Sequence, residues 1–205
     1  METRLAQREA GCCKMGATQS VQAVEHEQTK DLTKVLFTEE EIKTCVNQMG
    51  KRISEDYAGK NPLVVGVLTG GYVFMSDLAR TITVPHVVDF VKCSSYGSGT
   101  ESSGKVKFQL ETSHSIEGRH VIVVEDIIDT GLTLSNLVAH LSTMGPASIE
   151  VASLLDKKAR RKVEVKAKYV GLECPDEFVI GYGLDYDGAY RSLPMIGILK
   201  PEVYS

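Results

Sequence analysis

The stretch from Val121 to Leu134, VIVVEDIIDTGLTL, constrains the fold of this chain more than any other. It opens with β-branched apolar residues that do not alternate with polar ones, which predicts a strand buried on both faces of a parallel sheet. Glu125 and Asp126 would then lie at the carboxyl end of that strand, the edge where open α/β sheets bind ligands. The stretch therefore predicts a ligand site at this edge.

The next residues, Asp129 to Thr133, read DTGLT and would lead into a helix. Backbone amides at a helix start, helped by threonine hydroxyls, can bind a phosphate, and Gly131 would let the backbone approach it closely. The stretch lacks the GxxxxGK[ST] pattern of a Walker loop. A helix cap with acids near the helix dipole would explain Asp129 or Thr130 alone. It would not explain three acids and two threonines around one glycine.

Acids beside a phosphate loop narrow the choice of ligand. Carboxylates repel a bare phosphate, but they accept hydrogen bonds from sugar hydroxyls and they bind magnesium. The simplest ligand is a sugar phosphate, with its phosphate on the loop amides and its ribose hydroxyls on Glu125 and Asp126. Asp129 would then face the group at the anomeric carbon of the sugar.

The rest of the chain alternates between strand and helix patterns. Thr38 and Glu41 form a capping box ahead of an apolar stripe, which predicts the first helix. Strands are expected at 61–71, 86–96, 105–111, 148–156, 169–173 and 178–186, and further helices at 72–82 and 134–144. The pattern of 105–111 is that of a half-exposed antiparallel strand. These elements predict an α/β fold.

Composition bounds the remaining possibilities. With 205 residues and 42% hydrophobic content, the chain can form one well-cored domain, which we place at 33–205 after a disordered extension at 1–32. A net charge of −4 argues against bulk nucleic-acid binding, so the basic run from Lys157 to Lys162 is interpreted as a solvated loop near an anionic substrate. No apolar run is long enough for a membrane span. Five cysteines without metal-ligand spacing indicate reduced thiols in the cytosol.

The segment VVEDIIDTGLTL resembles the phosphoribosyl-pyrophosphate signature of the purine phosphoribosyltransferases, in particular the hypoxanthine-guanine type. Other segments match that family in order and spacing from about Val35 to the C-terminus: VLTGGYVFMSDL, VDFVKCSSYGSG, LLDK and CPDEFVIGYGLDYDGAYR. The resemblance implies the type I phosphoribosyltransferase fold, an open and mainly parallel sheet flanked by helices. A small C-terminal hood lobe would be built mainly from residues 169–205.

The resemblance also implies a reaction. The chain would transfer phosphoribose from phosphoribosyl pyrophosphate to hypoxanthine or guanine, giving IMP or GMP and pyrophosphate with the help of Mg²⁺. Asp129 matches the acid that accepts the proton of the purine imidazole nitrogen. Glu125 and Asp126 match acids that hold the ribose hydroxyls directly or through magnesium. The 5′-phosphate loop corresponds to Thr130, Gly131, Leu132 and Thr133.

The purine pocket of the family corresponds to Lys157, Phe178, Val179 and Asp185. Lys157 would donate to a 6-oxo group, which disfavours adenine, and Phe178 would stack on the base. Without the family, Phe178 and Val179 would be interpreted as core residues and Lys157 as a solvated lysine. Asp185 would also be a magnesium ligand, with Glu125 and Asp126.

Pyrophosphate would be held by Thr69, Gly70 and Arg191, and a non-proline cis peptide is expected between Leu68 and Thr69. Ser95 and Tyr96 match a pair in the family's lid over the reacting carbon. Many relatives carry lysine at the positions of Thr69 and Leu132. Activity is expected to survive both changes because backbone amides do most of the phosphate binding.

Two alternatives stay open. One is a non-catalytic regulator that keeps the fold to bind a nucleotide. The other is a transferase for another base, with xanthine more plausible than adenine. A homodimer or homotetramer is expected by analogy with the family alone.

Overall fold

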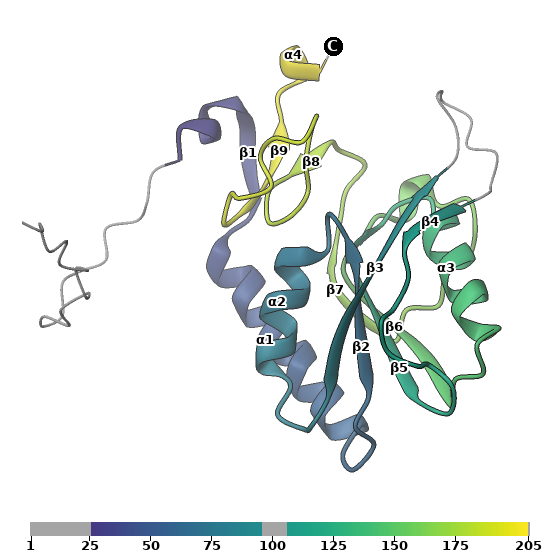
Figure 1. The fold of residues 1–205 in the computed structure, drawn as a ribbon. Helices are drawn as coiled ribbons and strands as arrows, with labels where there is room; N and C mark the ends of the chain where they lie inside the picture. Colours follow the sequence, from purple (N-terminus) through teal and green to yellow (C-terminus); the bar gives the residue numbers. More distant parts are fainter. Residues whose placement is uncertain (1–25, 96–105, 205) are drawn as a thin grey trace, which may run out of the picture.

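The computed structural model describes residues 26–95 and 106–204 (Figure 1). Its main sheet has six strands in the order β4-β3-β2-β5-β6-β7. They are β2 (Leu63–Leu68), β3 (Val87–Ser95), β4 (Val106–Leu110), β5 (His120–Ile128), β6 (Ser148–Asp156) and β7 (Tyr169–Glu173). All neighbours pair in parallel except β3 and β4. The predicted open, mainly parallel sheet with one antiparallel edge strand is confirmed.

Helices cover both faces of this sheet (Figure 1). Helices α1 (Glu39–Asp56) and α2 (Tyr72–Thr81) pack on one face, and α3 (Leu132–Ser142) packs on the other. Each face of the sheet has its own hydrophobic core, and alternate residues of β5 pack into both. Ile122 and Val124 join the core beneath α1 and α2, and Val121 and Val123 join the core beneath α3. This two-sided burial explains why the strand shows no polar alternation.

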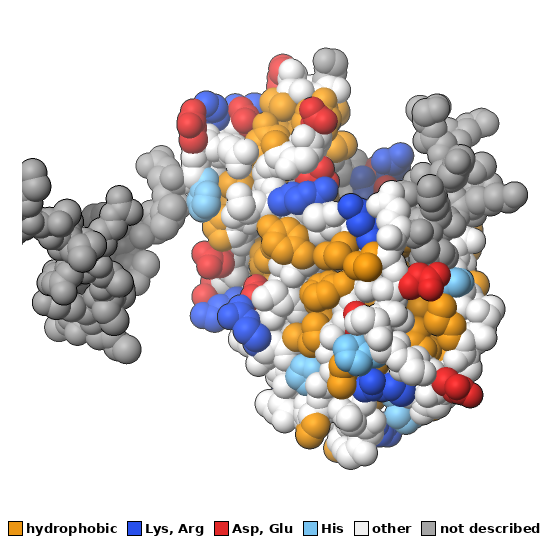
Figure 2. All heavy atoms as spheres, viewed as in Figure 1, with side chains coloured by type: hydrophobic (Ala, Val, Ile, Leu, Met, Phe, Trp, Pro, Cys, Tyr) orange, Lys and Arg blue, Asp and Glu red, His pale blue; other side chains and the backbone are white. Residues whose placement is uncertain are grey.

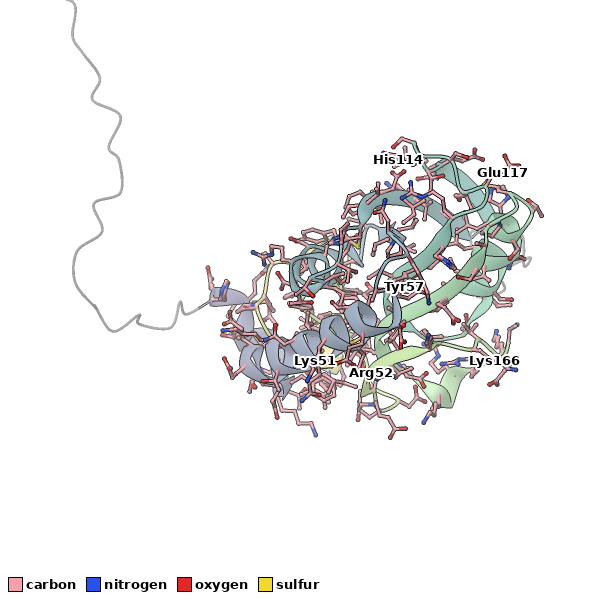
Figure 3. All side chains as sticks on the ribbon, turned by 90° about the horizontal axis from the view of Figure 1, so that it is seen from below. Lys51, Arg52, Tyr57, His114, Glu117 and Lys166 are labelled. Atoms are coloured by element: carbon pink, nitrogen blue, oxygen red, sulfur yellow. The ribbon has the colours of Figure 1, made fainter. Side chains whose placement is uncertain are left out.

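The end of α1 is tied to the edge strand β7. The hydroxyl of Tyr169 donates to Asp56 Oδ2 at 2.6 Å, and the guanidinium of Arg52 lies 5.5 Å from the Tyr169 ring centroid. Figure 3 labels Arg52 and Tyr57 near this end of the helix. At the other end, the predicted capping box of Thr38 and Glu41 is present.

A second sheet forms the hood. It has three antiparallel strands in the order β1-β9-β8, namely β1 (Leu32–Phe37), β9 (Ile196–Leu199) and β8 (Val179–Ile180). A short 3-10 helix (Glu27–Asp31) precedes β1, and α4 (Pro201–Tyr204) follows β9. The hood lies above the main sheet in the view of Figure 1.

The structure corrects the predicted domain limits in two places. The backbone nitrogen of Lys200 donates to Asp31 O at 2.9 Å, and Tyr190 donates to Asp31 Oδ2. Order therefore begins before residue 33, and the hood includes the N-terminal strand β1 as well as C-terminal residues. Strand β7, expected in the hood, belongs to the main sheet. Residues 1–25 lie outside the described part.

The expected strand at 178–186 is also mostly wrong. Only Val179 and Ile180 form a strand, because Gly181, Tyr182 and Gly183 all have positive φ and turn the chain back on itself. Among the helices of the described ranges, none is long and apolar enough to cross a membrane.

Candidate active site

Strand β5 and the residue after it bring Glu125 and Asp129 to a cavity of about 230 Å³, whereas Asp126 does not line this cavity. The strand continues past Glu125 and Asp126, since Ile127 and Ile128 still pair with β6. The predicted strand end was therefore too early, and Asp129 is the first residue beyond the strand. The cavity is lined by Val67, Leu68, Cys93, Glu125, Ile127, Ile128, Asp129, Thr130, Gly131, Thr133 and Leu134.

Asp129 has the least satisfied carboxylate of the predicted site. Its Oδ1 is buried and has no hydrogen-bond partner among the described residues. Its Oδ2 lies 3.8 Å from Nη1 of Arg160, whose side chain is 57% exposed. A buried polar atom without a partner is costly, so an unpaired carboxylate oxygen in a cavity indicates a ligand that supplies a donor.

The loop after Asp129 has the shape expected of a phosphate site. Gly131 has φ 81° and precedes α3, whose first-turn amides lack intrahelical partners. A Cβ on Gly131 would lie 2.4 Å from Val163 O, so no other residue fits without displacing that segment. Thr130 O accepts hydrogen bonds from the backbone nitrogens of Lys162 and Val163, at 2.9 and 3.1 Å. The connection between β6 and β7 thus fixes the backbone of the loop through these two hydrogen bonds.

Glu125 and Asp126 lie in an environment that disfavours two negative charges. Burial raises the pKa of the Glu125 carboxyl well above its usual range, and the adjacent Asp126 charge raises it further. Burial also raises the pKa of Asp126, although hydrogen bonds with the Glu125 carboxyl and from the Ile127 amide, and to a smaller extent the Arg191 charge, partly offset this effect. Such a pair is stabilised by hydroxyl donors or by a cation.

The predicted pyrophosphate turn lies between Asp126 and the hood. The peptide between Leu68 and Thr69 is cis, as expected. A Cβ on Gly70 would lie 1.8 Å from Asp126 Oδ2, and one on Gly183 would lie 2.1 Å from Gly70 O. Two glycines therefore let the acids, the turn and the hood come together.

Arg191 and Asp185 form an ion pair in the hood, with Nη2 and Oδ1 2.7 Å apart. Arg191 Nη1 also donates to Gly183 O at 2.6 Å, so this pair adjoins the pyrophosphate turn. Arg191 lines a larger groove of about 620 Å³ between α1, α2 and the hood. Hydrophobic and basic side chains gather beneath the hood in Figure 2.

Lys157 and Phe178 adjoin one another through the hood backbone. The Lys157 side chain is 8% exposed, and its Nζ donates to Glu177 O at 2.8 Å and lies 3.3 Å from Asp176 Oδ1. Phe178 is 37% exposed, and its ring stacks on that of Tyr204 with centroids 4.9 Å apart. Val179 is buried. The buried Lys157 ammonium thus contacts the residue before Phe178, and an exposed ring next in the chain to that contact suits a flat polar ligand better than a core.

The three carboxylates expected to bind magnesium do not form one cluster. No group of three or more His, Cys, Asp or Glu side chains in the described ranges could hold a metal alone. Glu125 and Asp126 are on β5, whereas Asp185 pairs with Arg191 in the hood. The residues fit Mg²⁺ only when a substrate supplies further oxygens, which is how Mg²⁺ is usually bound.

Some predicted residues lie outside the cavity. Thr69 is exposed and Leu132 is half-buried, and neither lines it. The backbone of Ser95 pairs with Val106, and Tyr96 lies beyond the described residues.

Sequence reasoning missed three residues that adjoin the site: Ile127, Cys93 and Arg161. Ile127 and Cys93 line the cavity, and burial raises the pKa of the Cys93 thiol to about 11. The interpretation of the basic run as solvated is wrong for Lys157 and Arg161, whose side chains are 8% and 16% exposed. In the sequence nothing distinguishes Arg161 from its basic neighbours.

Known proteins resemble this chain over most of its length. Residues 34–187 match the phosphoribosyl transferase domain. The hypoxanthine-guanine phosphoribosyltransferase of Staphylococcus aureus is 48% identical over 175 residues, covering 85% of this chain and 98% of that protein. The crystal structure of a hypoxanthine phosphoribosyltransferase from the same organism aligns with a TM-score of 0.85, with 47% identity, over 87% of this chain and 97% of the other.

A longer relative matches the same region. The bifunctional protein TilS/HprT of Listeria monocytogenes is 50% identical over 175 residues, which are 85% of this chain but only 27% of that protein. This chain thus spans about a quarter of the length of its bifunctional relative. Because the domain match covers most of the chain, the family is established: this chain belongs to the phosphoribosyltransferase family.

Proposed function

We propose that this chain transfers the 5-phosphoribosyl group from phosphoribosyl pyrophosphate to hypoxanthine or guanine. The bond between C1′ and the pyrophosphate oxygen breaks, and a bond between C1′ and the purine imidazole nitrogen forms. The products are IMP or GMP, pyrophosphate and the proton released from the purine. The relatives named for this activity support the proposal, and so does the chemistry of the cavity.

The unpartnered oxygen of Asp129 carries the proposal. Its Oδ1 is buried beside the phosphate loop and lacks a donor among the described residues. A purine imidazole N–H supplies that donor, and the carboxylate takes the proton as the nitrogen attacks C1′. General base catalysis of this kind contributes about 10²- to 10⁴-fold to a rate.

The donor substrate matches the charges around this carboxylate. The 5′-phosphate lies on the amides and hydroxyls of the loop from Thr130 to Thr133, where the start of α3 favours an anion. The ribose hydroxyls donate to Glu125 and Asp126, and burial, which raises the pKa of both carboxyls, supports a role for donors or a cation there. This division keeps the phosphate away from the carboxylates.

The purine lies at the boundary between β6 and the hood. Lys157 donates to the 6-oxo group, which requires its ammonium to release Glu177 O or to share its protons between the two acceptors. Phe178 offers an exposed ring for stacking, and the Val179 backbone supplies a hydrogen bond. Adenine is disfavoured because its amino group would meet the Lys157 donor.

Pyrophosphate departs between the turn and the hood. The amides of Thr69 and Gly70 hold it on one side, and the planar fork of Arg191 holds it on the other. Mg²⁺ would be held by Asp185, and on the ribose side by Glu125 and Asp126, together with oxygens of the donor. When bound, it neutralises the negative charge of the leaving group.

The first test is a spectrophotometric assay with phosphoribosyl pyrophosphate and Mg²⁺ that offers hypoxanthine, guanine, xanthine and adenine separately. We expect turnover of hypoxanthine and guanine and none of adenine, and the xanthine rate sets the remaining specificity. No turnover with any base, by a folded protein that still binds nucleotide, would instead indicate a regulator.

The second test replaces Asp129 with asparagine, which keeps the shape and removes the proton acceptor. We expect turnover to fall by about 10²-fold or more while binding of the donor substrate changes little. Glu164→Gln is the matched control, because Glu164 is an exposed acid on the connection behind the loop. A large loss of donor binding in Asp129→Asn would make Asp129 a binding residue instead of a base.

The proposal also covers the assembly and location of the enzyme. We expect a homodimer or homotetramer, which sedimentation analysis would measure, and a cytosolic location.

A further inference from the structure

We propose that Arg161 is a positioning residue for Asp129, and that its guanidinium sets where the proton-accepting carboxylate points. This inference rests on the proposed function, since it assigns to Arg161 a role in that reaction. Arg161 does not reach the cavity. Its action would pass through the backbone on which Asp129 is carried.

The guanidinium joins three acceptors from two strand ends. Nε donates to Asp129 O at 3.1 Å, and Nη2 donates to Ile128 O at 3.2 Å. Nη2 also forms an ion pair with the Asp156 carboxylate at the end of β6. Both side chains are mostly buried, at 16% and 12% exposed, so solvent competes weakly for these bonds.

The same contacts set Asp129 relative to Lys157. Ile128 O accepts from the backbone nitrogen of Lys157 at 3.0 Å as well as from Arg161. Asp156 directly precedes Lys157, so the ion pair between Arg161 and Asp156 also restrains the backbone that carries this lysine. The proposed proton acceptor and the proposed purine-reading lysine are therefore held in one frame.

Packing restrains the arginine from the other side. A Cβ on Gly131 would lie 3.2 Å from Arg161 Cδ, which shows how closely the stem of Arg161 lies against the phosphate loop. A lysine could reach one or two of the acceptors, but it lacks the planar fork that serves all three. Arg160 differs from Arg161, because its side chain is exposed and faces the Asp129 carboxylate instead of the Asp129 backbone.

The test compares Arg161→Ala and Arg161→Lys with wild type in single-turnover experiments, which measure transfer apart from product release. We expect the transfer rate to fall about 10- to 100-fold in both variants, because a misplacement near 1 Å can reduce a rate by that amount. The KM for phosphoribosyl pyrophosphate should change less than about threefold, since backbone bonds from Lys162 and Val163 still hold Thr130 O. Lys166→Ala is the matched control on the same connection, with an exposed side chain (Figure 3).

Chemical rescue separates positioning from general damage. Arg161 also lines a cavity of about 510 Å³ behind the site, through which a small cation can reach the space left by the side chain. Guanidinium at millimolar concentration should restore part of the transfer rate of Arg161→Ala, and methylammonium should restore less. Circular dichroism and melting would verify that the variants are folded.

Each outcome decides between distinct ideas. If wild type turns over 6-oxopurines and the Arg161 variants behave like Lys166→Ala, the positioning role is wrong and the proposed function stands. Equal losses of rate and of donor affinity, with no guanidinium rescue, would reduce Arg161 to general support of the fold. If wild type transfers nothing to any base, the proposed function itself has failed.

Discussion

Replacing Gly183 by alanine tests whether the hood must approach the pyrophosphate turn as closely as the structure shows. Gly183 has φ 101°, and an added Cβ would lie 2.1 Å from Gly70 O. The nearest atom is backbone, so it cannot move aside as the end of a side chain could. Gly70 in turn abuts Asp126, where its own Cβ would lie 1.8 Å from Oδ2. The clash would therefore pass from the hood to the acids of the site.

The expected magnitude has two parts. An L-residue with a left-handed backbone costs about 1–2 kcal/mol relative to glycine. Forcing a methyl group into a filled space costs about a further 1–3 kcal/mol. Gly188→Ala provides the control, because Gly188 has φ 79° in the same hood and nothing lies within 4 Å of its Cβ position. The difference between the unfolding free energies of the two variants therefore measures the cost of the close contact, which we expect to be about 2 kcal/mol.

Thermal melting and steady-state kinetics measure the two consequences. We expect Gly183→Ala to melt about 4–8 °C below Gly188→Ala, from the usual relation for a chain of this size. The KM for phosphoribosyl pyrophosphate should rise about tenfold in Gly183→Ala, because the pyrophosphate turn must shift. It should change little in Gly188→Ala. Equal melting temperatures and equal KM values in the two variants would refute the close contact between hood and turn.

Two further predictions concern the hood and the far end of β3. Tyr204→Ala removes the ring stacked on Phe178, a contact that contributes about 1 kcal/mol, so the purine KM should rise about fivefold, whereas Tyr204→Phe should match wild type. Burial alone would raise the pKa of Asp89, but hydrogen bonds, foremost from His114, lower it below its ordinary value of 3.8. Asp89 therefore stabilises the fold above pH 3.8, and this contribution is lost as the pH falls through the lowered pKa. Urea unfolding should accordingly show a flatter loss of stability below pH 4 in Asp89→Asn than in wild type, and parallel curves would refute this role.

The part of the site carried by one continuous segment could be predicted from the sequence. The buried strand, the acids and the glycine turn follow one another between Val121 and Thr133, and local rules link each residue type to its conformation. The run of apolar residues indicates burial on both faces, and Gly131 indicates the left-handed turn before α3. The cavity accordingly contains Asp129, Thr130 and Thr133, as the sequence predicts.

Contacts between distant segments could not be predicted in this way. The strand-like pattern at 178–186 predicted one long strand, but Gly181 and Gly183 have positive φ and turn the chain, and Gly183 lies against Gly70 O. The hood also recruits β1 from the other end of the described chain. The role of Arg161 could not be predicted for the same reason, since its acceptors Asp129 and Ile128 are 32 and 33 residues away in the sequence. Local pattern contains no information about such partners.

Backbone groups are the reason why we expect this site not to depend on lysine at Thr69 and Leu132. The phosphate loop is shaped by bonds to Thr130 O and by the left-handed Gly131, and the pyrophosphate turn by the approach of Gly70 to Asp126. None of these contacts uses the side chain of either residue. A lysine there would add attraction that salt screens, whereas oriented amides remain close to the ligand at any ionic strength. Donor binding should therefore depend more on the two glycines than on added charge at Thr69 or Leu132.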